Sequence, residues 1–256
     1  MGPEEFVRWV GEVGLPLPSG APDLLVAYHK ELVAEALVQN LIGPGTLDDV
    51  WGKHFADSVL GLVALTAAKD YRDVPRGTLP AFEGARVLDI GSGAGLPGIP
   101  LKILRPDFRT CLLEPRLKRA SFLERVTQAI GLEGVEVLPQ RAEDAARKPG
   151  YRESFDLVTA RAVSDLTVLL EYGLPFIHEG GILICYKGPS VTEELERAKA
   201  VSPQLGGVLE GAPNYLLPEG IGARTIVLFR KVSQTPARFP RRAGIPEKRP
   251  LGTQPK

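Results

Sequence analysis

A glycine-rich turn over residues 91–98 constrains the fold of this chain more than any other feature of its sequence. The turn follows Arg86–Ile90, whose β-branched and aliphatic side chains favour a strand, and it leads into Pro97, a residue suited to the first turn of a helix. In α/β sheets, a strand, a glycine-rich turn and a helix in this order mark the crevice where a ligand binds. We therefore expect an α/β fold with a ligand against this turn.

The spacing of the glycines indicates which ligand binds there. A dinucleotide-binding turn would follow the pattern G-x-G-x-x-G, whereas here position 96 is leucine and the glycines fall at 91, 93 and 95. This spacing, with Asp89 before it, is similar to that of S-adenosylmethionine-dependent methyltransferases and argues against an NAD-dependent oxidoreductase. Gly91 and Gly93 would let the backbone approach the amino acid part of the cofactor, and Asp89 would orient the loop or meet positive groups of the ligand.

Short apolar runs rich in β-branched residues alternate with amphipathic stretches after residue 85. The runs predict strands near 86–90, 109–113, 134–138, 155–160, 180–186 and 224–229. The amphipathic stretches predict helices near 97–104, 116–130, 141–146, 165–173 and 192–200. This alternation predicts a Rossmann-like class I methyltransferase fold, with a mostly parallel, seven-stranded sheet flanked by helices. Residues 204–222 are expected to loop back before an antiparallel last strand.

The chain of 256 residues divides into four parts. Residues 1–70 predict an N-terminal helical segment packed on the catalytic domain, with helices over 3–13, 22–39 and 47–68. Residues 71–84, rich in proline and glycine, predict a connection to the methyltransferase domain expected at 85–230. Residues 231–256 form a basic, proline-rich tail, for which we expect neither a helix nor a central strand because proline disfavours both.

Composition disfavours several classes of protein. Lys and Arg number 31 and Asp and Glu number 31, so the whole-chain charge neither favours nor disfavours a polyanionic partner. Cys111 and Cys185 lie in apolar runs, which predicts buried thiols rather than a disulfide or a metal site. The sequence has no signal-like N-terminus and no apolar run near the ~18 residues that span a bilayer, so we expect a cytoplasmic protein, by default a monomer.

Acidic side chains follow the second and third predicted strands. Glu114 stands where a carboxylate can accept hydrogen bonds from both ribose hydroxyls of a cofactor, and its distance from the glycine-rich turn favours this role over that of an acid at an exposed strand end. Glu143 and Asp144 stand where backbone and carboxylate can bind the adenine edge, and the alternative is that one of them caps a helix. Three acidic positions are therefore candidates for cofactor contacts.

Two routes of methyl transfer to nucleic acid are disfavoured. Enzymes that methylate exocyclic amines carry an Asn/Asp-Pro-Pro-aromatic signature after the fourth strand, but this chain has Thr159-Ala160-Arg161-Ala162. Methylation of pyrimidine C5 needs a reactive thiol in a polar, electropositive setting, and both cysteines here are expected to be buried in strands.

The sequence resembles the RsmG (GidB) family of bacterial methyltransferases over most of its length. The motifs that carry the resemblance are Asn40-Leu41, Trp51-Gly52-Lys53-His54-Phe55-Ala56-Asp57-Ser58, the loop from Asp89 to Pro100, Lys118-Arg119-Ala120-Ser121-Phe122-Leu123, Ala160-Arg161-Ala162, Lys187-Gly188 and Phe239-Pro240-Arg241-Arg242-Ala243-Gly244-Ile245-Pro246. The resemblance implies transfer of a methyl group from S-adenosylmethionine to guanine N7 in a loop of 16S ribosomal RNA. The RNA would be free, in an assembly intermediate or in the small subunit.

The resemblance also implies where the cofactor is bound. The implied contacts are Gly91, Leu96, Glu114, Pro115, Arg116, Ala142, Glu143 and Arg161. The pair Glu114-Pro115 departs from the family, in which Asp-Ser is commoner, but glutamate keeps the carboxylate. Arg161 has its own rationale, because a planar guanidinium could hold a phosphate or stack on guanine, a structural salt bridge being the alternative. Guanine N7 has an unprotonated lone pair, so we expect no catalytic base, only positioning and exclusion of water.

Local positive charge supplies the expected RNA contacts, although basic tails are often simply solvated. The residues expected to bind RNA are Arg161, Lys187, Arg238, Arg241, Arg242, Lys248 and Arg249. His54 and Asp57 are interpreted as structural contacts to the catalytic domain.

Two other functions are alternatives to an RNA methyltransferase. A small-molecule methyltransferase would use the N-terminal helices as a lid, but its basic tail would be unexplained. A non-catalytic RNA-binding module would not need Asp89, Glu114 and Glu143 together.

Overall fold

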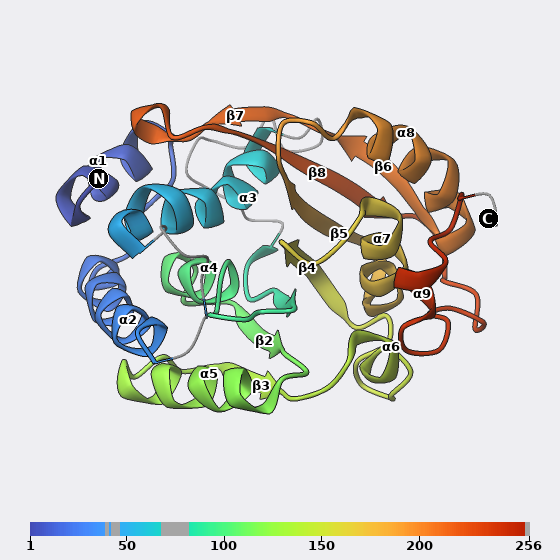
Figure 1. Ribbon diagram of the computed structural model, residues 1–256, viewed down its shortest axis with the longest axis horizontal. Helices are drawn as coiled ribbons and strands as arrows, with labels where there is room; N and C mark the ends of the chain where they lie inside the picture. Colours follow the sequence, from blue (N-terminus) through green and yellow to red (C-terminus); the bar gives the residue numbers. More distant parts are fainter. Residues whose placement is uncertain (39–40, 42–46, 68–81, 254–256) are drawn as a thin grey trace.

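The computed structural model describes residues 1–38, 41, 47–67 and 82–253. Its strands form one sheet in the order β3-β2-β1-β4-β5-β8-β6, with β7 also paired to β8 (Figure 1). The strands are β1 (Arg86–Ile90), β2 (Arg109–Leu113), β3 (Val135–Leu138), β4 (Phe155–Arg161), β5 (Ile177–Lys187), β6 (Gly207–Gly211), β7 (Asn214–Leu216) and β8 (Ala223–Lys231). Strands β1 to β5 pair in parallel and β8 pairs antiparallel to β5, which confirms the predicted fold class and the direction of the last strand.

The sheet has eight strands where seven were predicted. The additional pairing lies in residues 204–222, which were expected to be a loop. Strands β6 and β7 both pair with β8, along the edge that β5 does not occupy. Between them Pro213 has no N–H to donate, although its carbonyl still accepts from Ile226 N at 3.0 Å. The eighth strand is thus a continuation of the edge strand beyond a proline interruption.

The α-helices match the predicted ranges closely, with two exceptions. The helices are α1 (Pro3–Glu12), α2 (Ala21–Ala36), α3 (Ala56–Ala67), α4 (Gly98–Leu104), α5 (Leu117–Ala129), α6 (Ala142–Ala145), α7 (Leu166–Gly173), α8 (Thr192–Val201) and α9 (Ile245–Lys248). Short 3-10 turns cover Leu47–Asp49, Leu174–Phe176, Ser202–Leu205 and Pro218–Gly220.

Both exceptions have a local cause. The single helix predicted over 47–68 is divided, because a π-helical turn at Trp51–Phe55 precedes α3. The prediction that the C-terminal tail contains no helix was wrong: α9 forms one turn with Pro246 in its first turn, a position that requires no backbone N–H.

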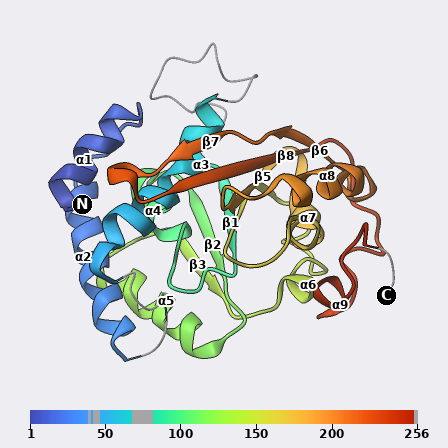
Figure 2. The same cartoon turned by 45° about the horizontal axis from the view of Figure 1, so that its top comes forward.

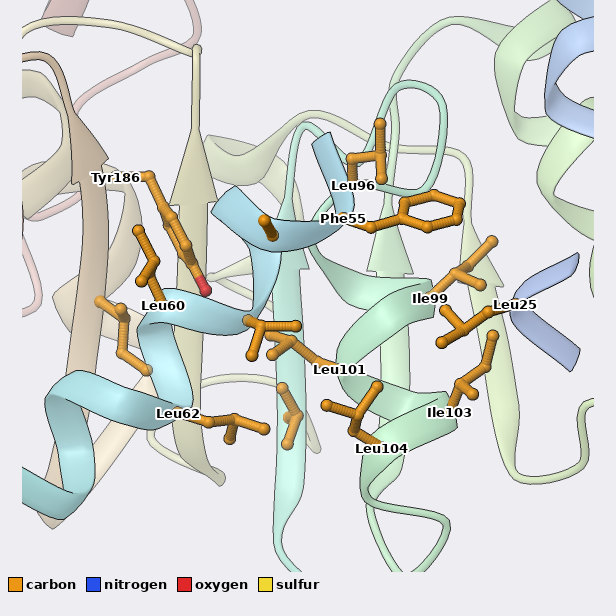
Figure 3. Close-up of a cluster of buried hydrophobic side chains, with 14 of the residues drawn as sticks. Leu25, Phe55, Leu60, Leu62, Leu96, Ile99, Leu101, Ile103, Leu104 and Tyr186 are labelled. Carbon is orange, nitrogen blue, oxygen red and sulfur yellow. The ribbon is translucent and has the colours of Figure 1, made fainter. Parts of the chain in front are cut away.

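Two hydrophobic clusters cover opposite faces of the sheet. Successive strand residues point to opposite faces, so Ile184 joins the cluster under α1 to α5 while Leu183 joins the one under α6 to α8. Figure 3 shows the first cluster, in which Leu25 and Phe55 lie with Leu101 of α4. Cys111 and Cys185 are buried and free, as predicted.

The N-terminal helices are built into the fold beside the loop that follows β1 (Figure 2). The Tyr28 hydroxyl of α2 donates to the carbonyl of Ala94 at 2.7 Å, and the Tyr186 hydroxyl of β5 donates to the carbonyl of Ser58 at 2.8 Å. Most of the connection expected at 71–84, like Asn40 of the family motif, lies outside the described residues. Within the described part of the chain, no helix is long and apolar enough to cross a membrane.

Candidate functional site

The loop after β1 requires glycine at three positions. Gly91, Gly93 and Gly95 have φ angles of 67°, 55° and 95°, which lie in the left-handed region that side chains disfavour. A Cβ on Gly91 would also come within 2.9 Å of Val163 Cγ2. The loop therefore brings bare backbone close to the ends of β2 and β4.

Asp89 holds this loop from inside the sheet. Its side chain is fully buried, accepting hydrogen bonds from the Thr159 hydroxyl at 2.7 Å and from Gly98 N at 3.2 Å. Burial raises the pKa of Asp89 to about 6, against the hydrogen bonds, which favour the charged form. Of the two roles considered for Asp89, the structure gives it the orientation of the loop.

Glu114 connects the loop to the end of β2. It is 3% exposed, and its two oxygens accept hydrogen bonds from Gly93 N at 2.9 Å and from Arg116 N at 2.8 Å. A carboxylate has about four lone-pair positions, so each oxygen keeps one for a ligand. Glu114 can therefore shape the loop and accept from ribose hydroxyls at once.

A cavity of about 750 Å³ opens beside this loop, and we call it the loop cavity. Its wall consists of Gly91, residues 114–116 and 119 after β2, residues 139–141, 144 and 148 after β3, residues 162–163 after β4, and Glu247 of α9. Four of the residues expected at the cofactor line it: Gly91, Glu114, Pro115 and Arg116. The carboxyl ends of the parallel strands thus form one hollow, as the sequence predicts.

The other residues expected to bind the cofactor do not line the loop cavity. Gly93 donates its N–H to Glu114, and Leu96 packs in the hydrophobic cluster (Figure 3). Ala142 and Glu143 are buried in α6, where Glu143 accepts a hydrogen bond from Gly244 N at 2.8 Å. One oxygen of Glu143 thus contacts the C-terminal segment, and the expected contact between Glu143 and adenine stays a prediction.

A second cavity of about 550 Å³, the basic cavity, adjoins the loop cavity. The two share Ala162 and Val163 in their walls, and Ala162 has a φ of 55°, which is uncommon for a residue with a side chain. The basic cavity is lined by Lys53, His54, Asp57, Arg161, Ser164, Tyr186, Lys187, Gly188 and Arg224 as well. The two hollows thus meet at the turn that follows β4.

Asp57 organises the basic cavity. Its oxygens lie 3.1 Å from Arg161 Nη1 and 3.1 Å from Arg224 Nε, and Arg161 also donates to the carbonyl of His54 at 3.2 Å. His54 and Asp57 therefore contact the sheet, as the sequence analysis expected. Arg161 therefore forms a structural salt bridge, which was the alternative considered for it. Its side chain also lines the basic cavity.

His54 is held in one protonation state. Burial, together with the charges of Arg161, Lys53 and Arg224, lowers the pKa of His54 to about 4. Its Nδ1 lies 3.3 Å from Arg161 Nη2, and because a guanidinium only donates, the ring proton is assigned to Nε2. This Nε2 is buried and has no hydrogen-bond partner among the residues that the structure describes.

The residues expected to bind RNA fall into two groups. Lys187 lines the basic cavity but pairs with Glu194 at 2.7 Å, and Arg241 pairs with Glu171 at 2.6 Å. The side chains of the other C-terminal candidates are exposed: Arg238, Arg242, Lys248 and Arg249. Their contact with RNA stays a prediction.

Sequence reasoning missed several residues of both cavities. Lys53 lies in the family motif around His54, so position alone could have suggested it. Arg224 and Tyr186 lie in strands β8 and β5 and carry no local signal. Glu247 lies in the C-terminal tail, for which the sequence predicts only RNA contacts by basic residues. Sheet pairing brings Arg224 and Tyr186 to the basic cavity, and the folding of the C-terminal segment onto the domain brings Glu247 to the loop cavity. No short sequence motif encodes either arrangement.

Comparison with known proteins identifies the family of this chain. The model of the GidB family, described as rRNA small subunit methyltransferase G, matches residues 22–211. A ribosomal RNA small subunit methyltransferase G from Carboxydothermus hydrogenoformans is 41% identical over 240 residues, covering 94% of this chain and 96% of the relative. One from Lactobacillus delbrueckii subsp. bulgaricus is 39% identical over 251 residues, covering 98% and 100%.

Solved structures agree with the fold. A Corynebacterium glutamicum protein matches with a TM-score of 0.50 and 17% identity, over 91% of this chain and 99% of its own. A 16S rRNA (adenine(1408)-N(1))-methyltransferase from Catenulisporales acidiphilia matches with a TM-score of 0.50 and 14% identity, over 60% and 88%. The sequence matches carry the assignment beyond the fold: the chain belongs to the rRNA small subunit methyltransferase G family.

Proposed function

We propose that this protein transfers the methyl group of S-adenosylmethionine to N7 of a guanine in 16S ribosomal RNA. The observation that carries the proposal is the junction of the two cavities at Ala162 and Val163, next to the loop that follows β1. A methyl donor in the loop cavity and a base in the basic cavity would meet there. Family membership supplies the ribosomal substrate.

The groups in the wall of the loop cavity can bind the parts of the cofactor. S-adenosylmethionine supplies an electrophilic methyl group on a sulfonium. Glu114 offers free lone pairs to ribose hydroxyls, and the backbone at Gly91 leaves space that a Cβ would fill. Asp89 and Glu114 keep the loop in place, so little reorganisation is needed when the cofactor binds.

The basic cavity suits a guanine nucleotide. The edge of guanine that carries N7 also presents the acceptor O6, and the cavity wall carries the donors Lys53, Arg161 and Arg224, which can bind O6 while the N7 lone pair stays free to attack the methyl group. Its positive side chains also suit the backbone phosphates of RNA. Because N7 is already unprotonated, the protein only has to orient the base, exclude water and hold the two reactants in line. We propose that it acts as a monomer in the cytoplasm.

Methyl transfer from labelled S-adenosylmethionine tests this function. The acceptors are 16S RNA and small subunits that lack the modification, and the product is digested to nucleosides. We expect 7-methylguanosine at one site and none from a Glu114→Ala control. Cofactor binding without any label in RNA would contradict the proposal and favour a small-molecule methyltransferase.

A further inference from the structure

The C-terminal segment, residues 239–249, belongs to the basic tail and folds against the catalytic domain. Figures 1 and 2 both place α9 beside α6 and α7. Arg147 and Arg152 of the domain donate hydrogen bonds to the carbonyls of Pro240 and Phe239. The segment thus has a fixed position, next to the part of the loop cavity formed by residues after β3.

Arg241 anchors this segment to α7. Its partner Glu171 is fully buried, accepting from the backbone N of Arg241 at 2.7 Å, from Nε at 2.9 Å and from Nη2 at 2.6 Å. A buried carboxylate that loses such a partner is left with an uncompensated charge, so the pair fixes the backbone at this point. Arg242, the next residue along the chain, has an exposed side chain.

Two further contacts lead from this anchor to the loop cavity. Gly244 N donates to Oε1 of Glu143 at 2.8 Å, which joins the C-terminal segment to α6. The Tyr172 hydroxyl lies between Glu143 and Glu247, and burial together with these two carboxylates raises the pKa of Tyr172. Glu247 itself is exposed and lines the loop cavity, whereas Glu143 is 3% exposed and does not line it.

We propose that the C-terminal segment forms the adenine wall of the cofactor site, with the Glu247 carboxylate accepting a hydrogen bond from the 6-amino group of adenine. Arg241 is a positioning residue that holds Glu247 there through Glu171 and the adjoining backbone. The inference rests on the proposed use of S-adenosylmethionine, because adenine is the part of that cofactor that lies near the residues after β3 in this fold. It gives the acidic role expected of Glu143 to a residue about a hundred positions later in the chain.

Isothermal titration calorimetry with S-adenosylhomocysteine and S-inosylhomocysteine tests the assignment. The inosyl compound carries an oxygen in place of the 6-amino group, and a carboxylate would repel it. The variants are Glu247→Gln and Arg241→Met. The matched controls are Glu12→Gln, which alters an exposed carboxylate of α1 outside the loop cavity, and Arg242→Met.

We expect the wild type to prefer the adenosyl compound and Glu247→Gln to reduce this preference by about tenfold or more, since the new amide can donate to the 6-oxygen. Arg241→Met should reduce the preference too, while Glu12→Gln and Arg242→Met keep it. A Glu247→Gln protein with the wild-type preference would overturn the inference, even if Arg241→Met fails to fold. A wild type that binds neither compound would instead overturn the proposed function.

Discussion

Replacing Glu114 with glutamine should weaken both the cofactor site and the loop that forms it. The carboxylate accepts backbone hydrogen bonds at 2.9 Å from Gly93 and 2.8 Å from Arg116, and it is 3% exposed. In the amide, one oxygen becomes an NH2 group that faces a backbone N–H, so one buried donor loses its acceptor. That loss costs about 1–3 kcal/mol of folding free energy.

The same change removes one charged acceptor from the ribose hydroxyls. A hydrogen bond to a charged group contributes about 1.5–3 kcal/mol, so the Kd for S-adenosylmethionine should rise about 10- to 150-fold. Titration calorimetry measures the affinity, and urea unfolding without ligand measures the stability. Glu114→Asp is the control that keeps the charge. A glutamine variant within twofold of the wild-type Kd would refute the ribose contact, and an unchanged unfolding free energy would refute the anchoring of the loop.

Three further predictions concern packing, RNA binding and pH. Gly61→Ala should destabilise the fold by about 1–3 kcal/mol in urea unfolding, because its Cβ would lie 2.1 Å from the Tyr186 hydroxyl, whereas the control Gly11→Ala, with open space around the Cβ, should stabilise helix α1 by up to about 1 kcal/mol. Arg224→Ala should weaken RNA binding and lower its logarithmic salt slope by about one with little change in cofactor Kd; an unchanged slope would place Arg224 away from the RNA. The pKa of His54 falls from 6.5 to about 4 on folding, so stability should be lost as pH drops from 6.5 towards 4, by at most about 3 kcal/mol, and His54→Asn should remove that part of the pH dependence.

The conformation of the loop after β1 could be predicted from the local sequence. Asp89, the glycines at 91, 93 and 95 and the strand before them are contiguous, and their conformations follow from residue type. Glu114 could be predicted as well, because adjacent parallel strands end at the same edge of a sheet. The predicted strands and helices of the catalytic domain follow from the same local patterns.

The edge of the sheet and the C-terminal segment were misjudged for one reason. Pairing of β6 and β7 with β8 joins residues whose own sequence, rich in glycine and proline, favours loops. Arg241 finds its place because Glu171, 70 residues earlier, is buried beneath it, and Gly244, which precedes α9, is held by Glu143. Charge in a sequence does not tell whether a side chain meets solvent or a buried partner.

The sequence alone therefore determined the fold class, the glycine-rich loop after β1 and the family, because hydrophobic periodicity, glycine spacing and contiguous motifs are local properties. Only the tertiary structure decided that Arg224, Tyr186 and His54 share one cavity and that Glu247 lines the other. Such groupings depend on which strands pair and where the chain returns, and these are fixed by burial over the whole domain.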